Sequence, residues 1–432
     1  SVVPCPAAIG RIDEGLPLFS RQQQEDWLRM CRELIVPSFD ITPEMMTHSV
    51  VVDPKTCRPV EPQLWEQYDW VELPDDEELV TEYIAAACRI LVNVGLTPTG
   101  VTSPGGFGGQ SLDLYARATG TAVRQTTGVP TPFFFQRITA EGTDIETPVW
   151  YADAACGTAT GEIIASTNDR TGSAFGYGEA DADYYLTEDL QGGRIAELVA
   201  AGQPVVFCSH WQGFYGLHDD DRRGFNVLKT MLGRLKQLDP DGTLTRWRTC
   251  SEITNYACMR ETARLEVDGR SIRLHLPVLT PELTLRVSGV RASGVTVDDA
   301  PLKRAAAKAA FRGGTYWSHG DATFLAFDPT APGPAGDDAL AGLTAEVAGL
   351  RSEFATALPH LVAALKRNDA VQDLTDRLTR AEKQLSQRRA LPSLLGVARA
   401  LHRVRQMYTG MRCRHGPDSD TRGDRPERRG GW

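Results

Sequence analysis

The chain has 432 residues, of which 41% are hydrophobic and 24% charged, and its formal net charge is −10. This composition supplies a core and excludes a wholly disordered chain, a collagen-like chain and a small disulfide scaffold. The negative charge argues against general nucleic-acid binding, and no apolar run approaches the ~20 residues that span a bilayer.

Nine cysteines are scattered along the chain without a CxxC pair. Their spacing gives no support for a zinc ribbon or for thioredoxin-type chemistry, and scattered thiols favour a reducing compartment over a secreted one. The N-terminal residues lack the charged and apolar regions of a signal peptide. We therefore expect a cytoplasmic protein. Because the chain begins at Ser1 rather than at Met, we also expect that its natural start lies upstream or has been processed away.

Residues 1–262 alternate extended and helical patterns, which is typical of α/β proteins with parallel strands and helices packed outside. The pattern fits a barrel or a doubly wound sheet, with fewer units than a complete eight-fold barrel needs. Helical spacing of apolar residues is clear at residues 80–94 and 224–238, and helices are also expected at residues 111–122 and 194–201. Ser251 is a candidate N-cap of a helix that ends near Met259, and short strands are expected at residues 38–41, 204–208 and 246–248.

Residues 263–327 have a different character, because apolar and polar side chains alternate with a period of two. Asp268-Gly269 is a hairpin signal within this stretch, so we expect a small antiparallel β domain. Residues 328–338 are rich in Pro and Gly and are expected to form a linker.

The C-terminal part reads as helical and then disordered. Apolar residues in 339–412 recur at three- and four-residue steps, which predicts a coiled coil or helical hairpin that can join copies of the chain in a homo-oligomer. Residues 391–411 mix apolar side chains with Arg, so they either lie on an anionic membrane surface or complete that hairpin. Residues 413–432 are rich in Arg, Asp and Gly and are expected to be a disordered basic tail.

His48 lies just beyond the strand expected at residues 38–41. Ligands of α/β folds bind at the carboxyl ends of the strands, and an imidazole with a carboxylate from Asp53 or Glu44 suits Zn, Co or Ni. The alternative is a histidine hydrogen-bonded within a loop, with Glu44 at a helix N-terminus. We take His48 and Asp53 as candidate metal ligands and zinc as the expected ion.

The strand expected at residues 204–208 delivers His210 to its carboxyl end, beside Trp211 and Tyr215. Imidazole titrates near neutral pH and can exchange protons with a substrate, so His210 is the first catalytic candidate. Aromatic neighbours suit the apolar faces of sugar rings, and Trp211 and Tyr215 are candidate substrate contacts. The alternative is a capping or interface histidine whose aromatic neighbours pack into the core.

Thr102 leads into the glycine-rich turn Ser103-Pro104-Gly105-Gly106-Phe107-Gly108-Gly109. Glycines allow close backbone approach and expose N–H donors to an anion or an oxyanion. The turn is neither GxGxxG nor a P-loop, so it gives weak support for a nucleotide site. It is either a structural turn or a binding loop, and in the second case the substrate contacts are Thr102, Ser103, Pro104, Gly105 and Phe107.

Two acidic residues are weaker catalytic candidates on the rim of the same face. Asp153 follows the run Val149-Trp150-Tyr151-Ala152, and Glu252 follows the strand expected at residues 246–248. The alternative for each is a helix cap or a surface charge.

Taken in this order, the motifs resemble the polysaccharide deacetylase superfamily, whose NodB-like members are distorted β/α barrels. The likeness covers roughly residues 1–260 at the level of motif order. Three segments of the chain look like the family's His-Ser/Thr-x-x-x-His motif, its Arg-x-Pro-x-Gly loop and its late His motif: Thr47-His48-Ser49, Thr102-Ser103-Pro104-Gly105 and Cys208-Ser209-His210.

The resemblance implies a metal, usually zinc, held by an Asp and two His, with a second Asp as base and the late His, here His210, as general acid. The chain departs from the family at several positions. Val52 stands where the second metal His would fall, Thr102 replaces the loop Arg, and Trp211 replaces the Asp after the late His. The paired Asp of the family's first strand has no counterpart, and we expect it upstream of Ser1 if it exists.

We therefore expect a NodB-like barrel over residues 1–262, incomplete at its N-terminus, that acts on carbon–nitrogen bonds other than peptide bonds. Its expected activity is metal-dependent removal of an acyl group from an N-acylated sugar or polysaccharide. One alternative is a non-catalytic glycan-binding or polysaccharide-assembly protein on a degenerate barrel. Another is a glycosidase, which needs two carboxylates such as Glu44 and Glu252. The expected partner is a carbohydrate, without nucleic acid and without a transmembrane segment.

Overall fold

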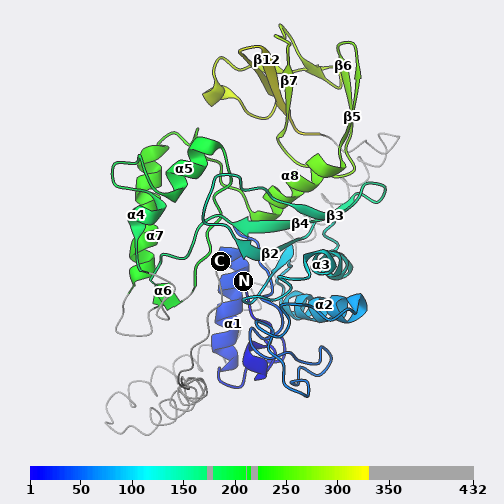
Figure 1. Cartoon of the computed structure of the whole chain (residues 1–432), viewed down its shortest axis with the longest axis vertical. Helices are drawn as coiled ribbons and strands as arrows, with labels where there is room; N and C mark the ends of the chain where they lie inside the picture. Colours follow the sequence, from blue (N-terminus) through cyan, green and yellow to red (C-terminus); the bar gives the residue numbers. More distant parts are fainter. Residues whose placement is uncertain (173–178, 211, 216–221, 330–432) are drawn as a thin grey trace, which may run out of the picture. The chain divides into compact units, whose positions relative to one another are not determined.

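A computed structural model describes residues 1–172, 179–210, 212–215 and 222–329 (Figure 1). The chain divides into two compact units, Ser1–Pro332 and Gly333–Trp432, and all described residues belong to the first. The coiled coil and the basic tail predicted for residues 339–432 lie outside the described residues, as do Trp211 and most of the expected linker.

The α/β part is built on a four-stranded sheet of order β1-β2-β4-β3. Parallel pairs join β1 to β2 and β2 to β4, and β3 runs antiparallel to β4 at the edge. The strands are β1 (Gly100–Thr102), β2 (Phe133–Ile138), β3 (Val149–Asp153) and β4 (Thr158–Ala165).

Single contacts join two further segments to this sheet. Val2 forms a parallel bridge with Pro43, whose carbonyl oxygen accepts the N–H of Thr102 at 2.9 Å. Beyond β4, the N–H of Ser166 donates to the carbonyl oxygen of Val206 at 2.9 Å. The part of the chain that the structure describes is mixed α/β and does not close into a barrel, so the distorted barrel stays a prediction.

Two helices sandwich the sheet at β4. A Cβ on Gly120 of α3 (Leu112–Thr127) would lie 2.3 Å from Oγ1 of Thr160, and a Cβ on Gly161 would lie 2.8 Å from Cγ2 of Thr254 in α8 (Cys250–Thr262). Successive strand residues point to opposite faces, so α3 and α8 cover opposite faces of β4. Both helices approach so closely because a glycine stands at each contact.

The helices form where the apolar spacing predicts them, with shifts at their ends. Helix α2 (Glu77–Asn93) begins after Asp76, whose side chain accepts the N–H of Leu79, and buries Val80, Tyr83, Ile84, Ala87 and Leu91. The remaining α-helices are α1 (Arg21–Met30), α4 (Ala182–Tyr185), α5 (Arg194–Ala201), α6 (Gln212–Tyr215) and α7 (Arg223–Leu238), and Cys31–Ile35 continues α1 as a π-helix. Short 3-10 helices span Pro6–Ala8 and Lys308–Ala310.

Residues 38–41, 204–208 and 246–248 form no strands, so these three predictions are wrong. Residues 204–208 are extended beside β4 and are held there by Ser166, whose N–H donates to the carbonyl oxygen of Val206 and whose Oγ accepts the N–H of Val206 at 2.9 Å. Pro204 has no N–H to donate to a ladder. Phe207 is exposed rather than buried, so the apolar run is not an interior strand.

The period-two segments form strands. β5 and β6 make a hairpin around Asp268-Gly269 in which Val267 faces Ile272. A second sheet has the order β10-β11-β12-β7, with β10 parallel to β11 and the other pairs antiparallel. The bounds are β5 (Arg264–Asp268), β6 (Ser271–His275), β7 (Leu283–Ser288), β8 (Thr296–Val297), β9 (Ala300–Pro301), β10 (Lys303–Arg304), β11 (Thr315–His319) and β12 (Ala322–Phe327).

None of the helices in the described residues is both long and apolar enough to cross a membrane.

Candidate functional site

Polar side chains follow two strands of the sheet and two segments that are hydrogen-bonded beside it. Glu44 comes directly after Pro43, Thr102 ends β1, Asp169 follows β4, and His210 follows the extended segment beside β4. Carboxyl ends of parallel strands meet at one edge of a sheet, which is where ligands of open α/β folds bind. The arrangement therefore collects these side chains at one edge of the sheet.

Two of these carboxylates affect the pKa of the Cys208 thiol. Its pKa is raised to about 11, first by burial and then by the negative charges of Asp169 and Glu44. Both carboxylates thus lie within electrostatic reach of one thiol. We take the pair Asp169–His210 and the pair Glu44–His48 together as the candidate site.

Asp169 and His210 form an imidazole–carboxylate pair. His210 Nδ1 lies 2.7 Å from Oδ2 of Asp169, and the backbone N–H of His210 donates to the same oxygen at 3.0 Å. The other oxygen of Asp169 accepts the N–H and the hydroxyl of Thr171, at 2.9 and 2.6 Å. Asp169 is buried, so its position is fixed from both sides.

The ionisation of Asp169 follows from these contacts. Burial opposes its charge, but the hydrogen bonds from His210 and Thr171 outweigh burial and hold the pKa of Asp169 below its usual value. Asp169 is therefore a carboxylate at neutral pH. A carboxylate on Nδ1 fixes the orientation of the imidazole ring.

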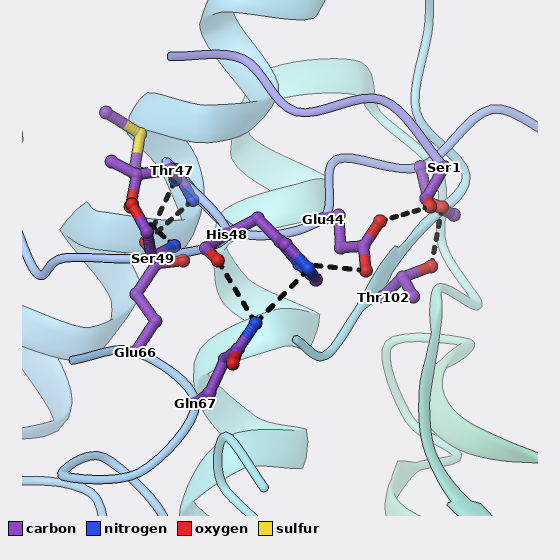
Figure 2. A network of polar contacts seen from close by, with 10 residues as sticks. Ser1, Glu44, Thr47, His48, Ser49, Glu66, Gln67 and Thr102 are labelled. Carbon is purple, nitrogen blue, oxygen red and sulfur yellow. Dashed lines mark hydrogen bonds and ion pairs between the residues drawn. The ribbon is translucent and has the colours of Figure 1, made fainter. Parts of the chain in front are cut away.

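Glu44 and His48 form the second pair (Figure 2). His48 Nδ1 lies 3.1 Å from Oε1 of Glu44, and the amide of Gln67 contacts Nε2 of His48 at 3.2 Å. Gln67 also donates to the carbonyl oxygen of His48 at 3.1 Å, and the Ser1 hydroxyl donates to Glu44 at 2.6 Å. The ring is thus held between Glu44 on one side and Gln67 on the other.

The two members of this pair stabilise each other's charge. The hydrogen bond that His48 donates to Glu44 raises the pKa of His48 against the opposing effect of burial. Burial also opposes the charge of Glu44, but His48 and Ser1 lower the pKa of that carboxyl. Since the His48 side chain is 45% exposed, solvent screens this attraction and the pair contributes little to stability.

The residues present do not fit the zinc site that the motif order implies. Both ring nitrogens of His48 are engaged, and Asp53 Oδ1 accepts the N–H groups of Lys55 and Thr56 at 2.9 and 2.8 Å as the cap of an exposed turn. Asp53 follows Val52, whose side chain enters the core. Catalytic zinc needs three protein ligands, and no group of three His, Cys, Asp or Glu is placed for a metal among the described residues.

The glycine-rich turn is a structural element. The N–H of Gly106 donates to the carbonyl oxygen of Gln67 at 3.1 Å, and the N–H of Gly108 donates to that of Trp70 at 2.8 Å. A Cβ on Gly106 would lie 2.8 Å from Cγ2 of Val71. The glycines therefore let this turn pack against residues 67–71, and these two N–H groups are not donors for an oxyanion.

The five residues of this turn that were expected to contact substrate differ in their burial. Ser103, Pro104 and Phe107 are buried, and the Ser103 hydroxyl donates to the hydroxyl of Tyr115 at 2.9 Å. These three predictions are not supported, because the side chains belong to the core. Gly105 is exposed, and Thr102 is half-buried with its hydroxyl 2.7 Å from that of Thr42.

The two weaker acidic candidates are caps. Asp153 Oδ1 accepts the N–H groups of Ala155 and Cys156 in the turn after β3, at 2.9 and 3.2 Å. Glu252 accepts the N–H of Thr249 at 2.8 Å, as half of the capping box that begins α8. Neither carboxylate contacts another residue of the site in the described part of the chain. Tyr215 ends α6, and Trp211 lies outside the described residues.

Three residues of the site were not found by sequence reasoning: Asp169, Glu66 and Gln67. Asp169 had a usable signal, because the run Thr158–Ala165 ends in Ser166-Thr167-Asn168-Asp169, an apolar strand followed by polar residues. Glu66 and Gln67 had none, since they lie in a loop and act through contacts with residues 46–49.

Comparisons of the chain with models of known families, with curated proteins and with solved structures found no match. The likeness to polysaccharide deacetylases therefore rests on the order of the three sequence motifs.

Proposed function

We propose that the chain hydrolyses the acyl–nitrogen bond of an N-acylated sugar or polysaccharide, with His210 as the proton-transferring residue and Asp169 as the carboxylate that orients it. The observation that carries this proposal is the 2.7 Å contact between His210 Nδ1 and the buried Asp169. The substrate class comes from the order of the motifs around His48, Thr102 and His210.

The reaction consumes one water and yields a carboxylic acid and a free amine. Water adds to the acyl carbon, the carbon–nitrogen bond breaks, and the nitrogen leaves as an amine once it is protonated. His210 takes a proton from the adding water through Nε2 and returns it to the leaving nitrogen, and Asp169 orients the ring during both transfers. Proton transfer by a positioned side chain contributes roughly 10²–10⁴-fold to a rate.

The second pair serves binding. Glu44 and His48 present charged and polar atoms at the half-exposed end of the site, and Thr102 lies on the neighbouring strand. Sugar hydroxyls are both donors and acceptors, so the Glu44 carboxylate and the Gln67 amide match them. No step is assigned to a metal, because the donor set of the described residues does not fit one.

The test is acetate release from N-acetylglucosamine oligomers by the full chain. The wild type is expected to release acetate, and His210→Ala is expected to lose that activity. His275→Ala is the matched control, because His275 is an exposed histidine of β6 that pairs with Glu266 at 3.4 Å. Equal rates in His210→Ala and wild type would remove His210 from the reaction, and new reducing ends instead of acetate would indicate a glycosidase.

A glycan-binding protein without catalysis is the second candidate. It is favoured by the turn amides being engaged in packing and by the lack of a three-ligand metal group within the described residues. Binding of the same oligomers without any product, retained in His210→Ala, would support this candidate and contradict the hydrolase.

A further inference from the structure

The segment that carries His48 has an unusual backbone. Met45 and His48 have φ angles of 47° and 57°, in the left-handed region that favours glycine. Residues with a Cβ occupy this region only where their surroundings hold them there, and such residues cluster at functional sites. The contacts that hold residues 45–48 therefore decide where the His48 ring lies.

Glu66 supplies these contacts from beneath the segment (Figure 2). Its side chain is fully buried, and Oε1 accepts the N–H groups of Met46 and Thr47, at 3.1 and 3.0 Å, between the two left-handed residues. The hydroxyl of Tyr83 in α2 donates to the same oxygen. The backbone N–H of Glu66 donates to the carbonyl oxygen of Ser49 at 2.7 Å, so Glu66 holds the segment at both ends.

We propose that Glu66 is the positioning residue of this site: through Oε1 it fixes the backbone between Met45 and His48 and so holds the imidazole between Glu44 and Gln67. The inference rests on the proposed function only in that it concerns the same site. This position requires a hydrogen-bond acceptor at the distance from the backbone that a glutamate side chain spans. The second oxygen, Oε2, has no hydrogen-bond partner among the described residues and can be replaced.

Two conservative variants separate the effect of side-chain length from the effect of the carboxylate charge. Glu66→Gln keeps an acceptor oxygen at the same reach without the charge, and Glu66→Asp keeps the charge but shortens the side chain by one methylene. A positioning role predicts that Gln substitutes for Glu66 and Asp does not. A role that depends only on the charge predicts the reverse.

The experiment uses the full chain with isotope-labelled histidine, in which the His48 ring signal is identified by its loss in His48→Ala. Amide hydrogen exchange is measured in parallel for the peptide that covers residues 45–49. Glu66→Gln is expected to keep the ring signal and the exchange rate of the wild type. Glu66→Asp is expected to move the ring signal and to speed exchange by about tenfold or more, because the segment opens locally.

Wild-type behaviour of Glu66→Asp would overturn the proposal. If Glu66→Asp does not fold, Glu66→Gln decides alone, since a moved ring signal or tenfold faster exchange in folded Glu66→Gln also overturns it. Tyr83→Phe is the control, because it removes a donor to the same oxygen from α2 and leaves the donors of the segment in place. Neither readout involves substrate, so an inactive wild type would refute the proposed hydrolase and leave this test intact.

Discussion

Asp169 holds His210 twice, by a side-chain contact of 2.7 Å to Nδ1 and by a hydrogen bond of 3.0 Å from the backbone N–H, both to the same carboxylate oxygen. The two residues come from segments that are 41 positions apart in the sequence. A carboxylate that binds both ring and backbone fixes the tautomer and the direction of the imidazole together. This geometry is what a proton-transferring histidine needs and what a surface histidine lacks.

Replacing Glu66 is expected to change how stability depends on pH. Burial raises the pKa of Glu66 from 4.5 to about 7, so its folded form binds a proton that the unfolded chain has already lost between these pH values. Stability from this group is present below pH 4.5 and is lost as pH rises through 7, by on the order of 3 kcal/mol. The stability of Glu66→Gln relative to that of the wild type should therefore rise between pH 5 and pH 8. Thermal unfolding at both pH values measures it, and a constant difference would contradict a raised pKa.

The left-handed backbone at His48 predicts an order of stability for two substitutions. Glycine adopts a φ of 57° without the steric cost that alanine has, so His48→Gly is expected to be more stable than His48→Ala by about 1 kcal/mol. Both variants remove the same imidazole and its contact with Glu44, which makes the comparison matched. Urea unfolding of the two proteins measures the difference, and alanine equal to glycine would show that this backbone is not left-handed.

Two glycine-to-alanine changes within helices are expected to have opposite signs. A Cβ at Gly120 in α3 would lie 2.3 Å from Oγ1 of the buried Thr160, whereas nothing lies within 4 Å of a Cβ at Gly233 in α7. Gly233→Ala should stabilise the protein by roughly 0.5–1 kcal/mol through helix propensity. Gly120→Ala should destabilise it by about 1–3 kcal/mol through overpacking against β4. Denaturant unfolding decides, and a stabilising Gly120→Ala would mean that α3 does not pack on β4 this closely.

His48→Ala is expected to leave the zinc content of the purified chain unchanged. The ring nitrogens of His48 contact Glu44 and Gln67, and the candidate second ligand, Asp53, caps its own turn. Metal analysis of the wild type and of His48→Ala is the measurement. About one zinc per chain that disappears in the variant would contradict this interpretation of the donor set.

The sequence predicted most of the helices and little of the site geometry. Helices α2 and α7 follow from apolar spacing, because each buries one apolar face, whereas α8 was expected from a cap at Ser251 and is capped by Thr249. Sequence spacing could not reveal that residues 67–71 satisfy the N–H groups of Gly106 and Gly108, because that partner segment lies some 40 residues away. Asp53 was assigned to a metal for a different reason, since a carboxylate that caps its own turn looks like a ligand in the sequence.

His210 shows both the strength and the limit of reasoning from strand ends. The run Pro204–Cys208 predicted His210 at the end of a strand; the run forms no ladder, but His210 contacts Asp169, which follows β4. The partner Asp169 follows β4, and the same rule applied to Thr158–Ala165 would have placed it at the carboxyl edge of the sheet. Reasoning from strand ends thus predicts the edge of the sheet at which a residue lies. It does not predict that Asp169 contacts His210, because this contact depends on how the two loops meet.

The most direct test of the hydrolase is the initial rate of acetate release from an N-acetylated oligosaccharide by Asp169→Asn beside the wild type. Asparagine keeps the shape of the side chain but cannot stabilise the protonated imidazole of His210. The account predicts a fall in kcat of about 100-fold or more with KM little changed, because the pair acts on proton transfer rather than on binding. A rate within about threefold of the wild type, or no acetate from the wild type itself, would contradict it.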